Sequence, residues 1–138
     1  MRGMAISVRQ PWASLIVHGL KSVEVRTWPT AYKGQLLIHA SKKLDEGAML
    51  RFPIEDPPRG CLIGTVELVE VEKLTKHRWN ELAAQHLNMG PYTSGLYAWH
   101  LNKPRPVALP VPYSGVRGLF FVNESDAAPE VRQGVLFS

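Results

Sequence analysis

The amino-acid sequence predicts an α+β domain built around a small, closed or half-closed β-barrel. Four to six short runs of strand length are separated by only two or three helical segments. Most of these runs are joined by connections other than strand–helix–strand crossovers, which argues against a parallel α/β sheet. Closing the sheet leaves no strand edge exposed, and 138 residues are enough for one such domain with its own hydrophobic core.

The segment 6–28, ISVRQPWASLIVHGLKSVEVRTW, is predicted to form a strand, a short helix and a second strand. The helix is expected to end at Gly19, because glycine readily adopts the left-handed backbone that ends a helix. Side chains alternate between the two faces of a strand, so Glu24, Arg26 and Trp28 share one face of the second strand. A carboxylate, a guanidinium and an indole therefore project together from a rigid element, which is typical of a binding site.

The rest of the chain continues the pattern as one domain over residues 1–122. Gly64 is expected to mark a bulge, and the prolines between 104 and 112 indicate an extended or edge-like passage. Residues 123–138 are predicted to form a C-terminal tail, either packed back on the domain or mobile. Further strands are expected at 35–40, 61–74, 96–101 and 118–122, and helices at 42–51, capped by Ser41, and at 76–87, capped by Thr75.

The composition is that of an ordinary globular protein with a small basic excess. A formal net charge of +4 favours polyanionic partners, although a solvated basic surface explains it equally well. Cys61 is the only cysteine, which excludes a disulfide within the chain and indicates a buried, inert thiol in a reducing cytoplasm. No secretory leader opens the chain, and no apolar run approaches the ~20 residues of a membrane-spanning helix. We therefore expect a cytoplasmic protein without membrane association.

The sequence carries no pattern typical of a metal or cofactor site. Its five histidines lack metal-ligand spacing. No P-loop, dinucleotide fingerprint or serine-hydrolase elbow is present either. We therefore expect neither a metal nor a cofactor.

The N-terminal segment resembles the ASCH domain (activating-signal-cointegrator homology), a branch of the PUA-like superfamily. The G-x-K-x-x-E-x-R pattern of that family is matched by Gly19, Lys21, Glu24 and Arg26, and the runs RQPW, LLIHA, GTVELV and GLFFV match as well. The resemblance extends over about residues 5–122. It implies a PUA-like small β-barrel of five to six strands with flanking helices, and a cleft in which relatives in the superfamily bind RNA or modified bases.

The resemblance and the residue types together suggest how RNA or a modified nucleoside would be bound. Arg26 would hold phosphate or a carbonyl and Glu24 would accept from an exocyclic amine, unless the two form only an ion pair on a half-exposed sheet. Lys21 would act as a phosphate contact or as a base, unless it is an exposed lysine near a helix C-terminus.

Aromatic and small polar residues complete the predicted ligand site. Trp28, at a strand end, is the better candidate for stacking on a base, whereas Trp12 either stacks or packs in the core. Arg117, between two turn glycines, either touches phosphate or is a solvated turn residue. Four further residues are placed at the mouth of the cleft by their position in the sequence: Ser7, Gln10, Ser41 and Lys42.

Two rival functions remain open. One ASCH branch hydrolyses N4-acetylcytidine with a lysine, a threonine and a glutamate; Lys21 matches that lysine, but Glu24 stands at the threonine position. If the chain is an enzyme, a nucleoside amidohydrolase or a ribonuclease, Lys21 and Glu24 are its expected catalytic residues. The second rival is an interaction module whose cleft binds a protein or a peptide. The candidates for a further catalytic carboxylate are Glu67, Glu70, Glu72 and Glu81.

Overall fold

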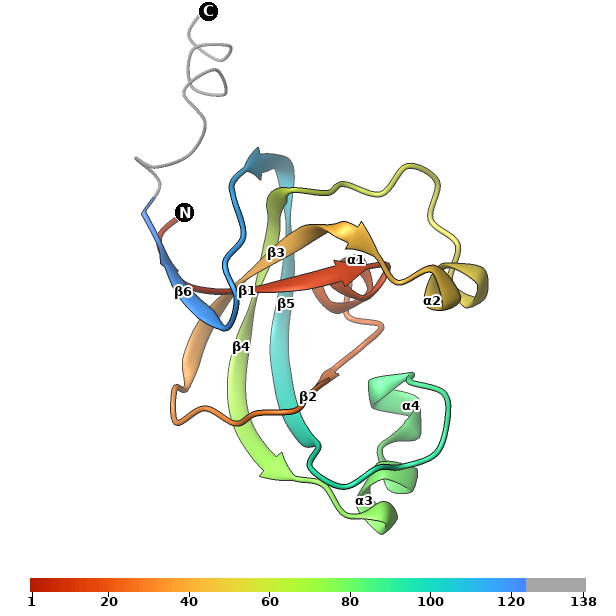
Figure 1. The fold of residues 1–138 in the computed structure, drawn as a ribbon. Helices are drawn as coiled ribbons and strands as arrows, with labels where there is room; N and C mark the ends of the chain where they lie inside the picture. The colour runs from red at the N-terminus through yellow and green to blue at the C-terminus, as the bar shows by residue number, and fades with distance from the viewer. Residues whose placement is uncertain (124–138) are drawn as a thin grey trace, which may run out of the picture.

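Six strands and four short helices make up residues 1–123, the part of the chain that the computed structural model describes (Figure 1). The predicted tail lies outside the described residues from position 124 onward. The strands are β1 (Gly3–Gln10), β2 (Val23–Arg26), β3 (Gly34–Leu44), β4 (Cys61–Lys73), β5 (Tyr97–Pro112) and β6 (Leu119–Val122). The helices are α1 (Trp12–Val17), α2 (Glu46–Arg51), α3 (Lys76–Glu81) and α4 (Ala83–His86).

The strands form one mixed sheet in the order β2-β5-β4-β3-β1-β6. Strands β1 and β3 run parallel, and the other neighbours are antiparallel. Strand β6 pairs with β1 only from Gly3 to Ile6, so the second half of β1 has no strand on that side. Arg26 of the opposite edge strand β2 reaches this free half and donates to the backbone oxygen of Ser7 at 2.8 Å.

The two edges therefore meet at a seam, which we define as the junction between β2 and the second half of β1. A side chain bridges the seam, and no strand ladder joins its two sides. The mixed α+β architecture of the prediction is thus correct, but the closed barrel is not confirmed. Strand β2 has only four residues, and they pair with β5 but form no ladder with β1.

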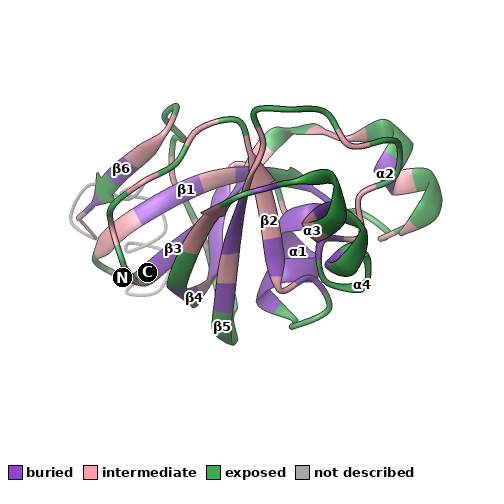
Figure 2. Ribbon diagram, turned by 90° about the horizontal axis from the view of Figure 1, so that it is seen from below, coloured by how far each residue is buried: buried purple, intermediate pink, exposed green. Residues whose placement is uncertain are grey.

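The main hydrophobic core lies on the side of the sheet that faces α1. All six residues of α1 are buried, and the helix contacts β1, β3, β4 and β5 (Figure 2). Ile6 and Val8 of β1 point into this core, together with Ile38 of β3. A second, smaller cluster covers the opposite face with Ala5 and Leu37. Side chains alternate between the two faces of a strand. The odd-numbered residues that follow Ala5 on β1 and Leu37 on β3 therefore also face away from α1.

The predicted Ser41 helix cap is wrong. Strand β3 continues to Leu44, which pairs with the end of β1, so the helix starts later. Its cap is Asp45, whose Oδ1 accepts from the backbone N–H of Ala48 at 3.1 Å. Ser41 instead donates to the backbone oxygen of Lys43 at 3.0 Å. Strand pairing over several residues thus outweighs a local capping preference.

Other local predictions are confirmed. Gly19 follows the end of α1 with a φ of 83°, a backbone region that favours glycine. Gly64 lies at a shift in the β4–β5 register, and a Cβ there would lie 2.5 Å from the backbone oxygen of Arg105. Thr75 caps α3 by accepting from the N–H of Arg78 at 3.1 Å. The proline-rich part of β5 pairs only with β4, as an edge-like passage requires.

Candidate functional site

Two adjoining cavities open at the seam. The larger has a volume of about 630 Å³ and lies between the sheet and the 113–118 loop; the smaller has about 510 Å³ and extends toward α1. We call the two together the cleft, because five residues belong to both linings: Ser7, Arg26, Trp28, Ser41 and Lys42.

The cleft is positively charged. Among the described residues that line it, Glu24 is the only carboxylate. Such a concentration of like charge raises the local concentration of anions. The basic excess of the chain is therefore gathered at one place rather than spread evenly over the surface. The cationic residues of the lining are Arg9, Arg26, Lys42, Lys43 and Arg117.

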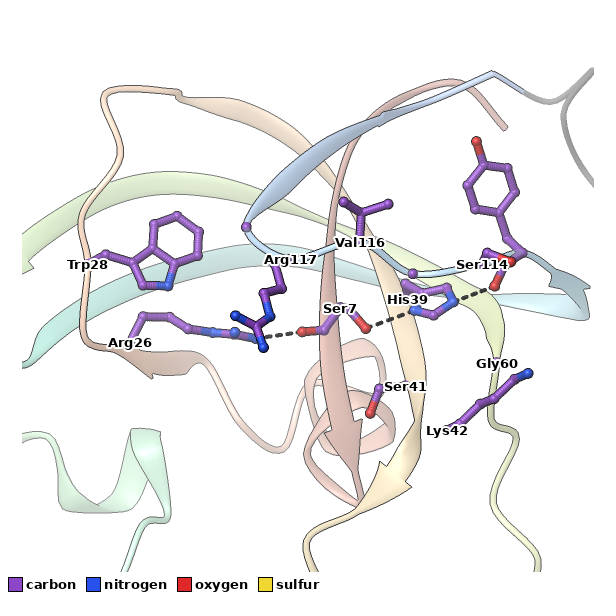
Figure 3. Close-up of a pocket in the computed structure, with 13 residues that line it drawn as sticks. Ser7, Arg26, Trp28, His39, Ser41, Lys42, Gly60, Ser114, Val116 and Arg117 are labelled. Atoms are coloured by element: carbon purple, nitrogen blue, oxygen red, sulfur yellow. Dashed lines mark hydrogen bonds between the residues drawn. The ribbon is translucent and has the colours of Figure 1, made fainter.

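Arg26 is held in place from two sides. Its Nε donates to Oε2 of Glu24 at 3.0 Å, and its Nη2 donates to the backbone oxygen of Ser7 at 2.8 Å. Within residues 1–123, its third nitrogen, Nη1, makes no hydrogen bond. The side chain lines both cavities, and Figure 3 shows it beside Ser7 in the larger one. A guanidinium fixed in this way presents planar donors to an anion with little further loss of side-chain entropy.

Lys21 lies outside the lining of both cavities. It is 1% exposed, and its Nζ donates to the backbone oxygen of His86 and to Oδ1 of Asn88. The same Nζ lies 3.8 Å from Oε1 of Glu24 and 4.5 Å from the centre of the Trp12 ring. Burial lowers the pKa of Lys21 from 10.5 to about 8, against the opposing effect of the Glu24 carboxylate. Lys21 therefore supports Glu24 from the protein interior.

The two tryptophans of the motif region have different surroundings. Trp28 is half-buried, lines both cavities and packs edge-on against Trp99, with ring centres 4.9 Å apart. The Trp99 ring also donates to the backbone oxygen of Trp28 at 3.2 Å. Trp12 is 9% exposed, belongs to the main core and donates from Nε1 to Oδ2 of Asp45 at 2.8 Å. Trp28 thus offers aromatic surface to the whole cleft, whereas Trp12 borders only the smaller cavity.

Gln10 lies away from the cleft. It is fully buried, its Oε1 accepts from the N–H of Ser14, and its Nε2 donates to the backbone oxygen of Pro58, both at 2.9 Å. The side chain therefore ties α1 and the 52–60 loop to β1. Ser41 lines both cavities.

A serine–histidine pair lies in the floor of the larger cavity (Figure 3). Ser7 and His39 are direct neighbours in the parallel β1–β3 pairing. Their Oγ and Nδ1 atoms are 2.9 Å apart, and Nε2 of His39 lies 2.6 Å from the backbone oxygen of Tyr113. A carbonyl only accepts, so Nε2 carries the proton and Nδ1 accepts from the serine hydroxyl. Burial lowers the pKa of His39, so the ring is neutral at pH 7.

Sequence reasoning placed Ser7 at the cleft but did not identify His39 as its partner. The sequence feature that could have pointed to this histidine is its position inside the apolar strand run LLIHA. The 113–118 loop covers the pair so closely that a Cβ on Gly115 would lie 2.7 Å from Cε1 of His39 and 3.0 Å from Oγ of Ser7. Glycine is therefore required at this contact.

Residues 1–123 contain neither a candidate metal cluster nor a helix able to span a membrane. No group of three histidine, cysteine, aspartate or glutamate side chains in this part is arranged to hold a metal ion. No helix in it has the length and apolar character needed to cross a membrane.

Comparison with known proteins identifies the family. The model of the ASCH domain matches residues 6–111, which is most of the chain. The chain belongs to the ASCH domain family. It is 41% identical over 83 residues to human "Activating signal cointegrator 1", and 30% identical over 128 residues to the mouse protein of the same name. These matches cover 49% and 82% of this chain but only 14% and 21% of the relatives, so this ASCH chain spans a small part of their length.

Solved structures show the same fold. The crystal structure of ASCH from Zymomonas mobilis has a TM-score of 0.66 at 17% identity, covering 98% of this chain and 95% of that one. A tyrosine-to-phenylalanine mutant of the same protein also gives 0.66 at 17% identity, with 98% of both chains covered. At this identity, the likeness establishes that the six-stranded α+β arrangement is an ASCH fold.

Proposed function

We propose that this ASCH domain binds single-stranded RNA in the cleft, with a phosphate at Arg26 and a base against Trp28. The arrangement of Arg26 carries the proposal. Glu24 and the Ser7 backbone orient its guanidinium beside an aromatic side chain, in a cleft lined by five cations and one carboxylate. Aromatic faces that stack bases, together with cations that follow the backbone, are the usual means of binding single-stranded nucleic acid.

The size of the cleft favours an unpaired nucleotide over a duplex. Cavities of about 630 and 510 Å³ accommodate a base and its sugar phosphate. A base enters a cavity of this kind only when it is not stacked and paired in a helix, which is why proteins read single-stranded RNA in this way. A modified base enters by the same route, and Glu24 in the smaller cavity would accept from an exocyclic amine.

The amidohydrolase alternative receives less support from the geometry. Its expected base, Lys21, is buried, contacts neither cavity and already donates to His86 and Asn88. We therefore assign Lys21 a supporting role behind Glu24 and place no reaction on it.

The direct test is fluorescence anisotropy with a short labelled single-stranded RNA of mixed sequence. Arg26→Ala should weaken binding by about 1.5–3 kcal/mol, the usual contribution of hydrogen bonds to a charged group. Trp28→Ala should weaken it by about 1–3 kcal/mol through lost stacking. Lys76→Ala, an exposed lysine on α3 outside the cleft lining, is the matched control and should bind like the wild type.

Salt dependence separates RNA from a protein ligand. If three cleft cations contact phosphates, log K should fall with log salt with a slope of about −2. Affinity that is unchanged in Arg26→Ala, with the fold intact by circular dichroism, would contradict the proposal, as would binding insensitive to salt. Mass spectrometry of the recovered RNA reveals cleavage, the outcome that would favour a ribonuclease instead.

A further inference from the structure

The Ser7–His39 pair has the arrangement of an activated nucleophile. A nucleophilic serine needs a base within hydrogen-bond distance, and the base needs a third group that fixes its orientation. Here Oγ of Ser7 lies 2.9 Å from Nδ1 of His39, and the backbone oxygen of Tyr113 lies 2.6 Å from Nε2. The carbonyl has the orienting role that a carboxylate has in a serine hydrolase, although the two ring nitrogens are exchanged, and it selects the tautomer in which Nδ1 is free to take a proton.

The surroundings of the pair leave room for a substrate. Both side chains line the larger cavity of about 630 Å³. Gly115 of the 113–118 loop closes one side of the pair, where a Cβ would lie within 3.0 Å of both side chains, so a substrate would approach from the cavity side.

We propose that Ser7 is a catalytic nucleophile, that His39 is its general base, and that the cleft hydrolyses carboxylic esters. In the first half-reaction, Oγ attacks the ester carbonyl carbon while Nδ1 of His39 takes the hydroxyl proton. The carbon–oxygen bond to the alcohol then breaks, the leaving oxygen takes this proton from His39, and the acyl group stays on Ser7. In the second half-reaction, water attacks the acyl carbon, its proton passes through His39 back to Oγ, and the carboxylic acid is released.

The chemistry of the base indicates esters rather than amides. A carbonyl fixes the His39 tautomer but brings no negative charge to stabilise the imidazolium that forms, and burial also disfavours that cation. The reaction therefore suits an alkoxide leaving group, which departs more easily than an amide nitrogen.

The neighbourhood of Ser7 indicates which esters. Nη2 of Arg26 donates to the backbone oxygen of Ser7 itself, so an anion held by Arg26 adjoins the nucleophile. We therefore expect the substrate to be an acyl ester of a nucleotide hydroxyl, with its phosphate at Arg26. This substrate class rests on the proposed RNA-binding function, whereas the nucleophilic pair does not.

The test uses an uncharged fluorophosphonate, which labels activated serines without requiring RNA binding. Intact-mass spectrometry followed by peptide mapping should place a single adduct on Ser7. Ser7→Ala should lose the adduct, and His39→Gln, which keeps a polar side chain, should label at least about 100-fold more slowly, the range expected for loss of a general base. The matched control Ser94→Ala, an exposed serine outside the cleft lining, should label like the wild type.

The pH profile distinguishes catalysis from packing. The labelling rate should rise with pH through a pKa below 6.5, the lowered pKa of His39, and then remain level. Folded protein that binds RNA but gives no adduct on Ser7 would overturn the nucleophile and leave the proposed function intact. Labelling at Ser7 without RNA binding would overturn the nucleotide substrate and support the nucleophile. Equal labelling of Ser7→Ala and wild type would overturn the assignment of Ser7.

Discussion

Two lysines and two tryptophans lie in or near the cleft, one of each in the interior and one of each on the open side. On the interior side, Lys21 lies over the Trp12 ring, and the two side chains are 1% and 9% exposed. On the open side, Lys42 and Trp28 line both cavities of the cleft. The residue types are identical, but the two interior side chains hold the site together, whereas the two open side chains line the cleft that a ligand would enter. Burial, rather than membership of a motif, separates the two roles.

This difference in burial explains why the G-x-K-x-x-E-x-R motif contacts the cleft only in part. Of its charged residues, Glu24 and Arg26 line the cleft, whereas Lys21 supports Glu24 from inside. Each prediction that follows compares a change on the interior side with a matched change on the open side.

The largest difference should appear in the pH dependence of stability. The pKa of Lys21 is lowered from 10.5 to about 8 by burial, so the unfolded chain binds more protons than the folded one between these values. Stability from this group therefore increases as pH rises through that window. Between pH 8 and pH 10, the free energy of unfolding of the wild type should rise by about 2 kcal/mol relative to Lys21→Met.

Urea denaturation of both proteins at the two pH values measures this change. Lys42→Met, on the open side of the comparison, should follow the wild type, because Lys42 is exposed. If Lys21→Met shows the same pH dependence as the wild type, Lys21 is not the buried cation described above.

A smaller difference is expected between the two tryptophans. Trp12→Phe should lower the free energy of unfolding by about 1 kcal/mol, because the Asp45 carboxylate loses its hydrogen bond from the indole nitrogen. Its affinity for RNA should change little. Trp28→Phe retains an aromatic ring against Trp99 and should leave stability nearly unchanged. Thermal or urea unfolding, combined with the anisotropy assay, distinguishes the two variants. A larger loss of stability in Trp28→Phe than in Trp12→Phe would contradict the placement of Trp12 in the interior and Trp28 on the open side.

Local features of the chain were predictable from the sequence because they depend on neighbouring residues. The end of α1 just before Gly19, the cap at Thr75 and the shared face of Glu24 and Arg26 follow from backbone preference and strand alternation. The Ser41 cap failed because pairing between β1 and β3 extends the strand beyond the position where the local preference would start a helix.

The composition of the site was less predictable because it depends on contacts that are distant in sequence. Ser7 meets His39 only through the parallel pairing of β1 with β3, and the pair is completed by the backbone of Tyr113. No spacing within one segment encodes that arrangement. In the same way, the burial of Lys21 depends on Asn88, 67 residues later in the chain.

The central claim is that RNA enters the cleft on its open side. The four tryptophans give four indole N–H signals in a ¹H–¹⁵N correlation spectrum, and the variants Trp12→Phe and Trp28→Phe assign two of them. Titration with a short single-stranded RNA should shift the Trp28 signal most and leave the signal of Trp79, a buried residue of α3 outside the cleft lining, in place. Binding that shifts Trp79 and leaves Trp28 unchanged would contradict the account.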